Sequence, residues 1–344
     1  MKMNRQNRKN SPEKGVALVV TIWIITILVI VALEFSSAMR LESYSVKNYQ
    51  EEAQLYAWAC GAYERALGEL NCRHDPFLRQ KKKDLLREQI PAAKWEWLID
   101  GRPYTFSLGQ GTCQVRIYGE AGKININLAS ERTLRQVATC LGLEGESRDI
   151  LVDSILDWRD PDDFYRAHGA ENEYYRSLQE PYDCKNGNLA TIEELLLVRG
   201  VSKELFWGKK ILFPGEKEEK IVGLKDIFSV YAAGEQIDLN AAGWPVLRCF
   251  LGLPGEIAEK VISMREEREF ENLTDLSQRV PEIQPFLKEI GRFISFRPLH
   301  PYYTIETRAW MRENELGRSL KAIIKIDARE KNGYKVIQWI DHIP

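Results

Sequence analysis

The sequence has little of the chemistry that metalloenzymes and hydrolases commonly use. Its four histidines and six cysteines include no C-x-x-C pair, which argues against a structural zinc cluster, and no G-x-S-x-G nucleophile elbow occurs. Basic side chains are not in excess either, since 48 Lys and Arg against 50 Asp and Glu give a formal net charge of -2. A hydrophobic share of 44% excludes a disordered chain. We therefore predict a folded protein and find no sequence motif that points to an enzyme.

One stretch of the chain lacks charge altogether, the 18 residues Val16–Leu33. As a helix it would span about 27 Å, close to the ~30 Å of a hydrocarbon core. Residues 1–14 carry five basic side chains and one acidic one, so this flank should stay cytoplasmic. We expect a single-pass protein of the inner (cytoplasmic) membrane whose bulk is periplasmic or otherwise extracytoplasmic.

The residues just before this stretch resemble a processing site. Lys14-Gly15 followed by Val16-Ala17-Leu18-Val19-Val20 is similar to the class III leader of type IV pilins and type II secretion pseudopilins. That resemblance implies cleavage between Gly15 and Val16 by a prepilin peptidase, and methylation of the new N-terminus. An uncut signal anchor is the alternative interpretation.

A helix should continue well beyond the membrane. Residues 40–70 contain no Pro, and their apolar residues recur at helical spacing, so we predict one helix over residues 16–70. Its second half is amphipathic and should pack on its own globular head. The residues that give this spacing are Leu55, Trp58, Ala59, Ala62, Ala66 and Leu70.

Strand signals lie on both sides of a long central segment. A hairpin is predicted from 104–108 and 113–118, and three further strands follow near the C-terminus at 303–311, 319–327 and 334–340. The predicted fold class is α+β: a pilin-like long N-terminal helix on a small antiparallel sheet, with a large inserted α-helical domain. The predicted order is a leader (1–15), a transmembrane part (16–33), the amphipathic helix with the first half of the sheet (34–122), the insertion (123–298) and the C-terminal strands (299–344).

The insertion contains an internal repeat. Ile124–Ala129 returns as Ile237–Ala242, and the Leu-Gly-Leu at 141–143 returns at 251–253. We predict two helix-hairpin-helix (SAM-like) repeats, at about 123–215 and 235–298. Asn127 and Asn240 are the predicted helix N-caps, and each first helix should end near a Gly with positive φ.

Helix-hairpin-helix units often bind nucleic-acid phosphates, so charge has to be weighed. Residues 123–297 hold 23 Lys and Arg against 31 Asp and Glu. A phosphate-binding surface should be positive, and we therefore predict no nucleic-acid partner.

Several motifs carry a closer resemblance. The chain is similar to the minor pseudopilin K family of type II secretion in its Gly15 leader, in Val20 where most pseudopilins carry Glu, and in four motifs of the insertion: Lys123-Ile124-Asn125-Ile126-Asn127, Asp157-Trp158-Arg159-Asp160-Pro161-Asp162-Asp163, Gly169-Ala170-Glu171-Asn172-Glu173-Tyr174-Tyr175 and Leu195-Leu196-Leu197-Val198-Arg199-Gly200.

This resemblance implies a subunit without enzymatic activity at the pseudopilus tip. There it would help to initiate pseudopilus assembly and protein export across the outer membrane, beside I- and J-type minor pseudopilins. A minor pilin that primes a type IV pilus or DNA-uptake filament is the alternative.

An acidic cluster in the insertion is the candidate ligand site. We predict that Asp157, Asp160, Asp163, Glu171 and Glu173 bind Ca²⁺, because hard carboxylate oxygens suit this ion and the resemblance implies calcium in this lobe. The alternative is a solvated acidic loop in which Asp160 or Asp162 caps a turn.

The six cysteines permit disulfides if the head is exported. Cys60 and Cys72 would lie about 18 Å apart on one helix and cannot bridge. Cys72 with Cys113 is the favoured pair among many open connectivities.

Overall fold

The computed structural model describes residues 13–86, 96–297, 301–311 and 317–341, so the leader prediction falls mostly outside the described residues. The chain divides into two compact units, Met1–Ala57 and Trp58–Pro344. The second unit holds the sheet and the insertion, and the described residues of the first unit form one helical stretch.

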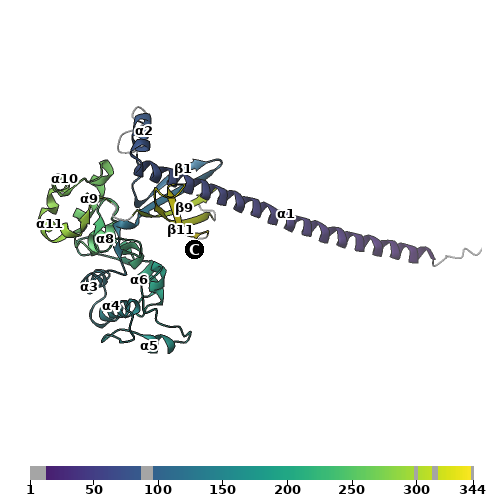
Figure 1. Ribbon diagram of the computed structural model, residues 1–344. Coiled ribbons are helices and arrows are strands. Elements are labelled where there is room, and N and C mark those ends of the chain that lie inside the picture. Colours follow the sequence, from purple (N-terminus) through teal and green to yellow (C-terminus); the bar gives the residue numbers. More distant parts are fainter. Residues whose placement is uncertain (1–12, 87–95, 298–300, 312–316, 342–344) are drawn as a thin grey trace, which may run out of the picture. The chain divides into compact units, whose positions relative to one another are not determined.

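Helix α1 (Glu13–His74) is the long helix of Figure 1, and it confirms the helix predicted over 16–70. The apolar side chains between residues 16 and 33 are all exposed to solvent. Within the described part of the chain, α1 is the one helix long and apolar enough to cross a membrane, with a mean hydropathy of 3.1 over its best 18-residue window. The hydroxyl groups of Thr21 and Thr26 donate to backbone carbonyls one turn earlier, which removes two donors from an apolar surface. The first unit is therefore suited to a lipid environment.

The second unit is built on a five-stranded antiparallel sheet with the order β1-β2-β9-β10-β11. Its strands are β1 (Asp100–Leu108), β2 (Gly111–Gly119), β9 (Tyr302–Trp310), β10 (Arg318–Ile326) and β11 (Tyr334–Ile340). All five predicted strands are confirmed to within a few residues. The pairing of β2 with β9 unites two halves of the sheet that the insertion separates in sequence.

The last turns of α1 pack on this sheet. Ala59, Ala62 and Ala66 are fully buried, and their small side chains permit close approach of the helix backbone. The hydroxyl of Thr307 on β9 donates to the Ala59 carbonyl at 3.1 Å, and Tyr63 meets Trp339 of β11 edge to face at 5.0 Å between ring centroids. The predicted helix-on-sheet arrangement is therefore present within this unit.

The insertion has its own apolar core and consists mostly of short helices. Its main helices are α3 (Glu131–Cys140), α4 (Gly145–Arg159), α8 (Trp244–Cys249) and α9 (Gly255–Glu267). The other elements between His74 and β9 are α2 (Pro76–Leu86), η2 (Glu120–Gly122), β3 (Ile124–Asn125), α5 (Asn172–Arg176), η3 (Ile192–Leu197), α6 (Lys203–Trp207), β4 (Lys209–Ile211), β5 (Lys220–Val222), α7 (Leu224–Ile227), β6 (Phe228–Ser229), β7 (Ile237–Asp238), α10 (Leu273–Arg279), η4 (Pro281–Ile283), α11 (Gln284–Ile290), η5 (Gly291–Phe293) and β8 (Ile294–Ser295).

The internal repeat is visible as two helix pairs, α3 with α4 and α8 with α9. Each helix pair lies in sequence between the two strands of a short parallel pairing, β3 with β6 in the first copy and β7 with β8 in the second. Gly142 and Gly252 end the first helices with φ of 79° and 68°, as predicted. Whether these pairs are helix-hairpin-helix motifs in the strict sense stays a prediction.

The predicted N-caps are wrong. Ser130 caps α3 by accepting from the Thr133 amide, and Gly243 precedes α8. Asn127 and Asn240 instead each bind a distant backbone segment: the side-chain amide of Asn127 exchanges two hydrogen bonds with Leu189, and that of Asn240 does the same with Phe270. These two side chains therefore satisfy the backbone N–H and C=O groups of a neighbouring segment. Buried backbone polar groups need such hydrogen-bond partners.

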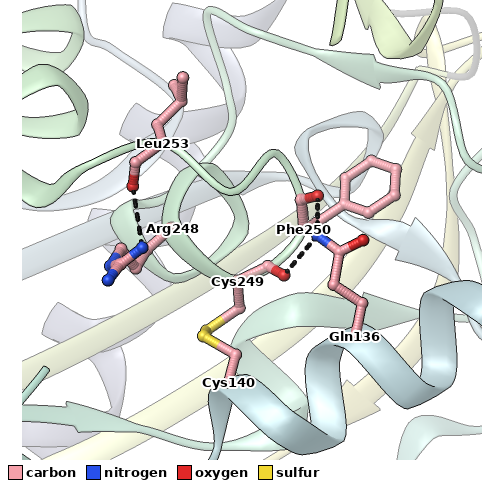
Figure 2. The surroundings of a disulfide bond; sticks show 6 residues. All are labelled: Gln136, Cys140, Arg248, Cys249, Phe250 and Leu253. Carbon is pink, nitrogen blue, oxygen red and sulfur yellow. Dashed lines mark hydrogen bonds between the residues drawn. A yellow bond between two sulfur atoms is a disulfide. The ribbon is translucent and has the colours of Figure 1, made fainter. Parts of the chain in front are cut away.

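The favoured disulfide is also wrong. Cys140 at the end of α3 is bonded to Cys249 at the end of α8, with 5.3 Å between Cα atoms (Figure 2). Cys72 and Cys113 are free thiols. The Cys113 thiol lies 3.7 Å from the carbonyl of Trp58, which is about 21 Å along α1 from Cys72. The observed bond joins the two copies of the repeat. Beside it, Gln136 of α3 donates to the Phe250 carbonyl at 2.6 Å.

Candidate functional site

The acidic cluster begins on the buried face of α4. Residues 151–158 of this helix are all buried, and Asp157 among them is 0% exposed. A loop then carries Asp160 and Asp163 to the start of α5, which Glu171 precedes. Gly169 is required here, because a Cβ at this position would lie 1.7 Å from Asp157 Oδ2.

Four of the five predicted ligands lie in one neighbourhood. The Arg166 guanidinium donates to the carboxylates of both Asp157 and Asp160, the latter at 2.7 Å. Negative charge on Asp157, Asp160 and Asp163 contributes to a raised pKa at Glu171. Glu173 is different: it is exposed on α5, and among the described residues it has no hydrogen bond or ion pair to the other four.

Glu171 is the unusual member of this group. It is 4% exposed, and neither carboxylate oxygen accepts an N–H or O–H hydrogen bond from the residues the structure describes. Burial raises the pKa of Glu171 to about 7; the hydrogen bond from the Cys184 thiol opposes this shift, and the negative charges of the neighbouring carboxylates add to it. A buried acid without donors is costly when it is ionised, so this side chain needs either a proton or a cation.

The oxygens without partners fit a hard cation. Besides Glu171, the buried Oδ1 atoms of Asp160 and Asn186 lack a hydrogen bond in the described part of the chain. Carboxylate and amide oxygens are typical calcium ligands, so Asp157, Asp160, Asp163, Glu171 and Asn186 are a suitable donor set. The described residues bring no three acidic, His or Cys side chains into a ready metal-binding group. Calcium binding stays a prediction, and it would require Arg166 to move away from its two carboxylates.

Asn186 and Arg166 were not identified from the sequence as members of the acidic cluster. The Asn186 amide nitrogen donates to Asp163 Oδ1 at 2.8 Å and to the Asp162 carbonyl at 3.0 Å, and its φ of 46° is the one positive value outside Gly among the described residues. An Asn-Gly pair was the available signal, since Asn tolerates this conformation better than most residues. The turn predicted under the alternative interpretation is present, because Asp162 Oδ1 accepts from the Phe164 amide at 2.9 Å.

The insertion is joined to the sheet by buried charges within the second unit. Arg265 of α9 is 1% exposed and donates to Asp100 of β1 at 2.9 Å. It also donates to the carbonyls of Leu239 and Ala242. On the other side, Glu120 accepts from the Thr304 hydroxyl at 2.7 Å. These contacts link the insertion and its connecting segment to the sheet.

The fold defines a class: a pilin-like arrangement of a long apolar N-terminal helix and a small antiparallel sheet, interrupted by a helical insertion. Residues 118–207 match the family model for type II secretion system protein K. The chain is similar to the type II secretion system protein K of Aeromonas hydrophila, with 25% identity over 199 residues, and to that of Pectobacterium carotovorum subsp. carotovorum, with 23% identity over 211 residues.

These alignments cover 56% and 57% of this chain but only 60% and 61% of the two relatives, so the match spans about three fifths of their length. One solved structure, that of the GspK-GspI-GspJ complex of the enterotoxigenic Escherichia coli type 2 secretion system, contains a chain with the same fold. The TM-score is 0.56 at 16% identity, with 87% of this chain and 99% of that chain covered. The resemblance to the K family that the sequence predicts is thereby confirmed.

Proposed function

We propose that this protein is a K-type minor pseudopilin, a structural subunit at the tip of a type II secretion pseudopilus that helps to initiate its assembly and protein export. The observation that carries the proposal is the order of parts along the chain. A helix that is apolar enough for a membrane continues into a sheet-bound helix, and a helical domain that matches the K family interrupts the sheet. This role needs no catalytic residue.

The proposed orientation places residues 1–14 in the cytoplasm and the second unit outside the inner membrane. The basic leader supports this orientation, and the Cys140–Cys249 bond is compatible with an oxidising compartment. We include in the proposal cleavage after Gly15 by a prepilin peptidase and methylation of Val16.

The proposed partners are I- and J-type minor pseudopilins of the same system. The solved chain with this fold comes from a complex titled with K, I and J subunits. Val20 supports a terminal position, because an apolar side chain cannot form an ion pair with the N-terminal amine of a further subunit.

Calcium is part of the proposal as a stabilising ion of the insertion. Asp157, Asp160, Asp163, Glu171 and Asn186 would hold it, and its charge would replace that of Arg166 beside the buried carboxylates. The ion would then stabilise the folded insertion by binding the native state alone.

A deletion strain tests the function. Loss of the gene should retain exported enzymes in the periplasm and leave twitching motility and DNA uptake unchanged. The intact gene should restore export, and the tagged full-length product should copurify with I- and J-type subunits from detergent extracts. Normal export combined with a loss of piliation or DNA uptake would instead support the minor pilin of a type IV system.

A further inference from the structure

Two adjacent aromatic side chains project from the acidic loop of the insertion. Phe164 is 81% exposed and Tyr165 is 67% exposed, so both side chains bury little surface against the rest of the chain. Single exposed apolar residues are common, but two large neighbouring rings at such exposure form a contiguous apolar surface that water solvates poorly.

The loop is held in place on both sides of this pair. Before it, Asp162 Oδ1 accepts from the Phe164 amide at 2.9 Å, and Asp163 Oδ1 accepts from Asn172 and from Asn186, each at 2.8 Å. After it, the Arg166 amide donates to Asp157 Oδ2 at 3.1 Å. Within the described part of the chain, the side chains of Phe164 and Tyr165 have no hydrogen bond or aromatic ring contact of their own. A loop fixed in this way loses little conformational entropy when its side chains bind.

The surroundings of the pair are acidic. Asp162 and Asp163 directly precede the pair and are exposed, and Glu173 is exposed on α5, whose first residue Asn172 donates to Asp163 Oδ1 at 2.8 Å. The basic side chain that follows the pair, Arg166, is neutralised by two carboxylates of the cluster. The exposed basic side chain of α5, Arg176, is paired with Asp183 at 2.7 Å. A partner that covered Phe164 and Tyr165 would therefore meet a negative rim, which favours basic partners and repels acidic ones.

We propose that Phe164 and Tyr165 are the centre of a docking surface for a protein that presents an apolar pocket with a basic rim. Aromatic side chains at the centre of an interface usually carry much of its binding energy, while a charged rim selects the partner and accelerates association. This surface goes beyond the proposed tip role, since it is defined by two exposed rings and the neighbouring carboxylates and not by α1.

Photo-crosslinking from the full-length chain in cells tests the proposal. The photoreactive residue p-benzoylphenylalanine would replace Phe164 or Tyr165, and Phe77 would serve as the matched control. Phe77 is 74% exposed and its amide donates to Asp75 Oδ1 at 2.8 Å, as that of Phe164 does to Asp162, but it begins a helix rich in basic residues.

We expect one discrete protein adduct from positions 164 and 165 and none of that size from position 77. The crosslinked segment of the partner should have a net positive charge. Glu173→Lys should lower the yield several-fold, and so should a rise in salt when isolated membranes are irradiated. Phe164→Ala with Tyr165→Ala should weaken binding of the identified partner about 30-fold or more and leave the melting temperature unchanged.

Several results would overturn this proposal. Adducts to lipid alone would identify a membrane surface as the occupant, and adducts to a second copy of this chain would identify self-association. An acidic partner segment, or an adduct yield that changes neither with Glu173→Lys nor with salt, would contradict the charge argument. Adducts no stronger than those from position 77 would mean that the pair has no partner.

Discussion

Arg265 of α9 and Asp100 of β1 form a buried ion pair, with 2.9 Å between the guanidinium and the carboxylate and side chains 1% and 4% exposed. Burial opposes the ionised form of Asp100, but its hydrogen bond from Arg102 and the charge of Arg265 hold the pKa of Asp100 below its usual range. The pair joins an insertion helix to the edge strand of the sheet, so the two parts of the second unit are coupled at this point.

Arg265→Met should therefore destabilise the second unit by about 3–5 kcal/mol, because it removes one of the two guanidinium groups that pair with the buried Asp100 carboxylate and leaves two buried carbonyls without that donor. Denaturant unfolding of the full-length protein in detergent measures this loss. Arg102→Met is the matched control, since Arg102 binds the same carboxylate from a site 25% exposed and its loss should cost less. Equal effects of the two substitutions would contradict the assignment.

The same ion pair should make the stability of the fold depend on pH in the acidic range. A carboxyl whose pKa is lowered in the folded state contributes stability that is present above its unfolded pKa of about 3.9 and is lost as the pH falls below it. The melting temperature of the native protein should fall between about pH 4 and pH 2 more steeply than that of an Asp100→Asn variant. Parallel curves for the two proteins would show that Asp100 has no shifted pKa.

Much of this architecture can be read from the sequence, and the failures have physical causes. The apolar stretch before Leu33 and the alternating strands follow local periodicity, which a linear pattern preserves. The role of Asn127 depends on Leu189, a residue 62 positions away that no local pattern identifies. The repeat itself was detectable, but the pairing of Cys140 with Cys249 depends on how α3 and α8 approach each other.

The acidic cluster shows the same division. Its carboxylates are obvious in the sequence, and four of the five predicted ligands gather around Arg166. Glu173 fails because the short α5 turns it to solvent, whereas Asn186 comes from a loop after that helix. Sequence composition therefore identifies the acidic segment, but which residues lie together in the site depends on the tertiary structure.

Processing gives a prediction that is independent of the head. Mature protein isolated from the membrane should begin at Val16 and carry an N-methyl group, as mass spectrometry of the N-terminal peptide would show. Gly15→Val should block cleavage and leave the mass of the full-length chain. A native protein that starts at Met1 in cells with an active prepilin peptidase would exclude the pilin-type leader.

The disulfide should stabilise the insertion. Cys140 and Cys249 are separated by 109 residues, and a crosslink that closes so long a loop restricts the unfolded chain, which is typically worth about 2–4 kcal/mol. A Cys140→Ser, Cys249→Ser variant should melt several degrees lower and be insensitive to reductant. Cys72→Ser is the control, because Cys72 is a free thiol and its replacement should leave the reductant response intact. A native melting temperature that does not change on reduction would contradict this role.

Calcium should act through Glu171, and its effect should depend on pH in a defined direction. The pKa of Glu171 is about 7 in the folded protein, above an unfolded value of about 4.3, so the group favours folding at low pH and this contribution is lost as the pH rises through 7. Calcium would stabilise the ionised carboxylate and offset this loss. The rise in melting temperature caused by calcium should therefore be small at pH 6 and larger at pH 8, where a concentration 100-fold above the dissociation constant would contribute about 2.7 kcal/mol.

Two amide substitutions separate this site from a general effect of ions. Glu171→Gln keeps the shape of the side chain and removes its charge, so it should abolish the pH dependence and reduce the calcium response. Glu173→Gln changes an exposed neighbour without contacts to the cluster and should leave both unchanged. Magnesium should stabilise less than calcium, because it demands tight octahedral geometry. Equal melting temperatures of the native protein in chelator and in millimolar calcium at pH 8 would contradict calcium binding and support the alternative, a solvated acidic loop held by Arg166. Equal effects of the two substitutions would mean that the ion binds at another site.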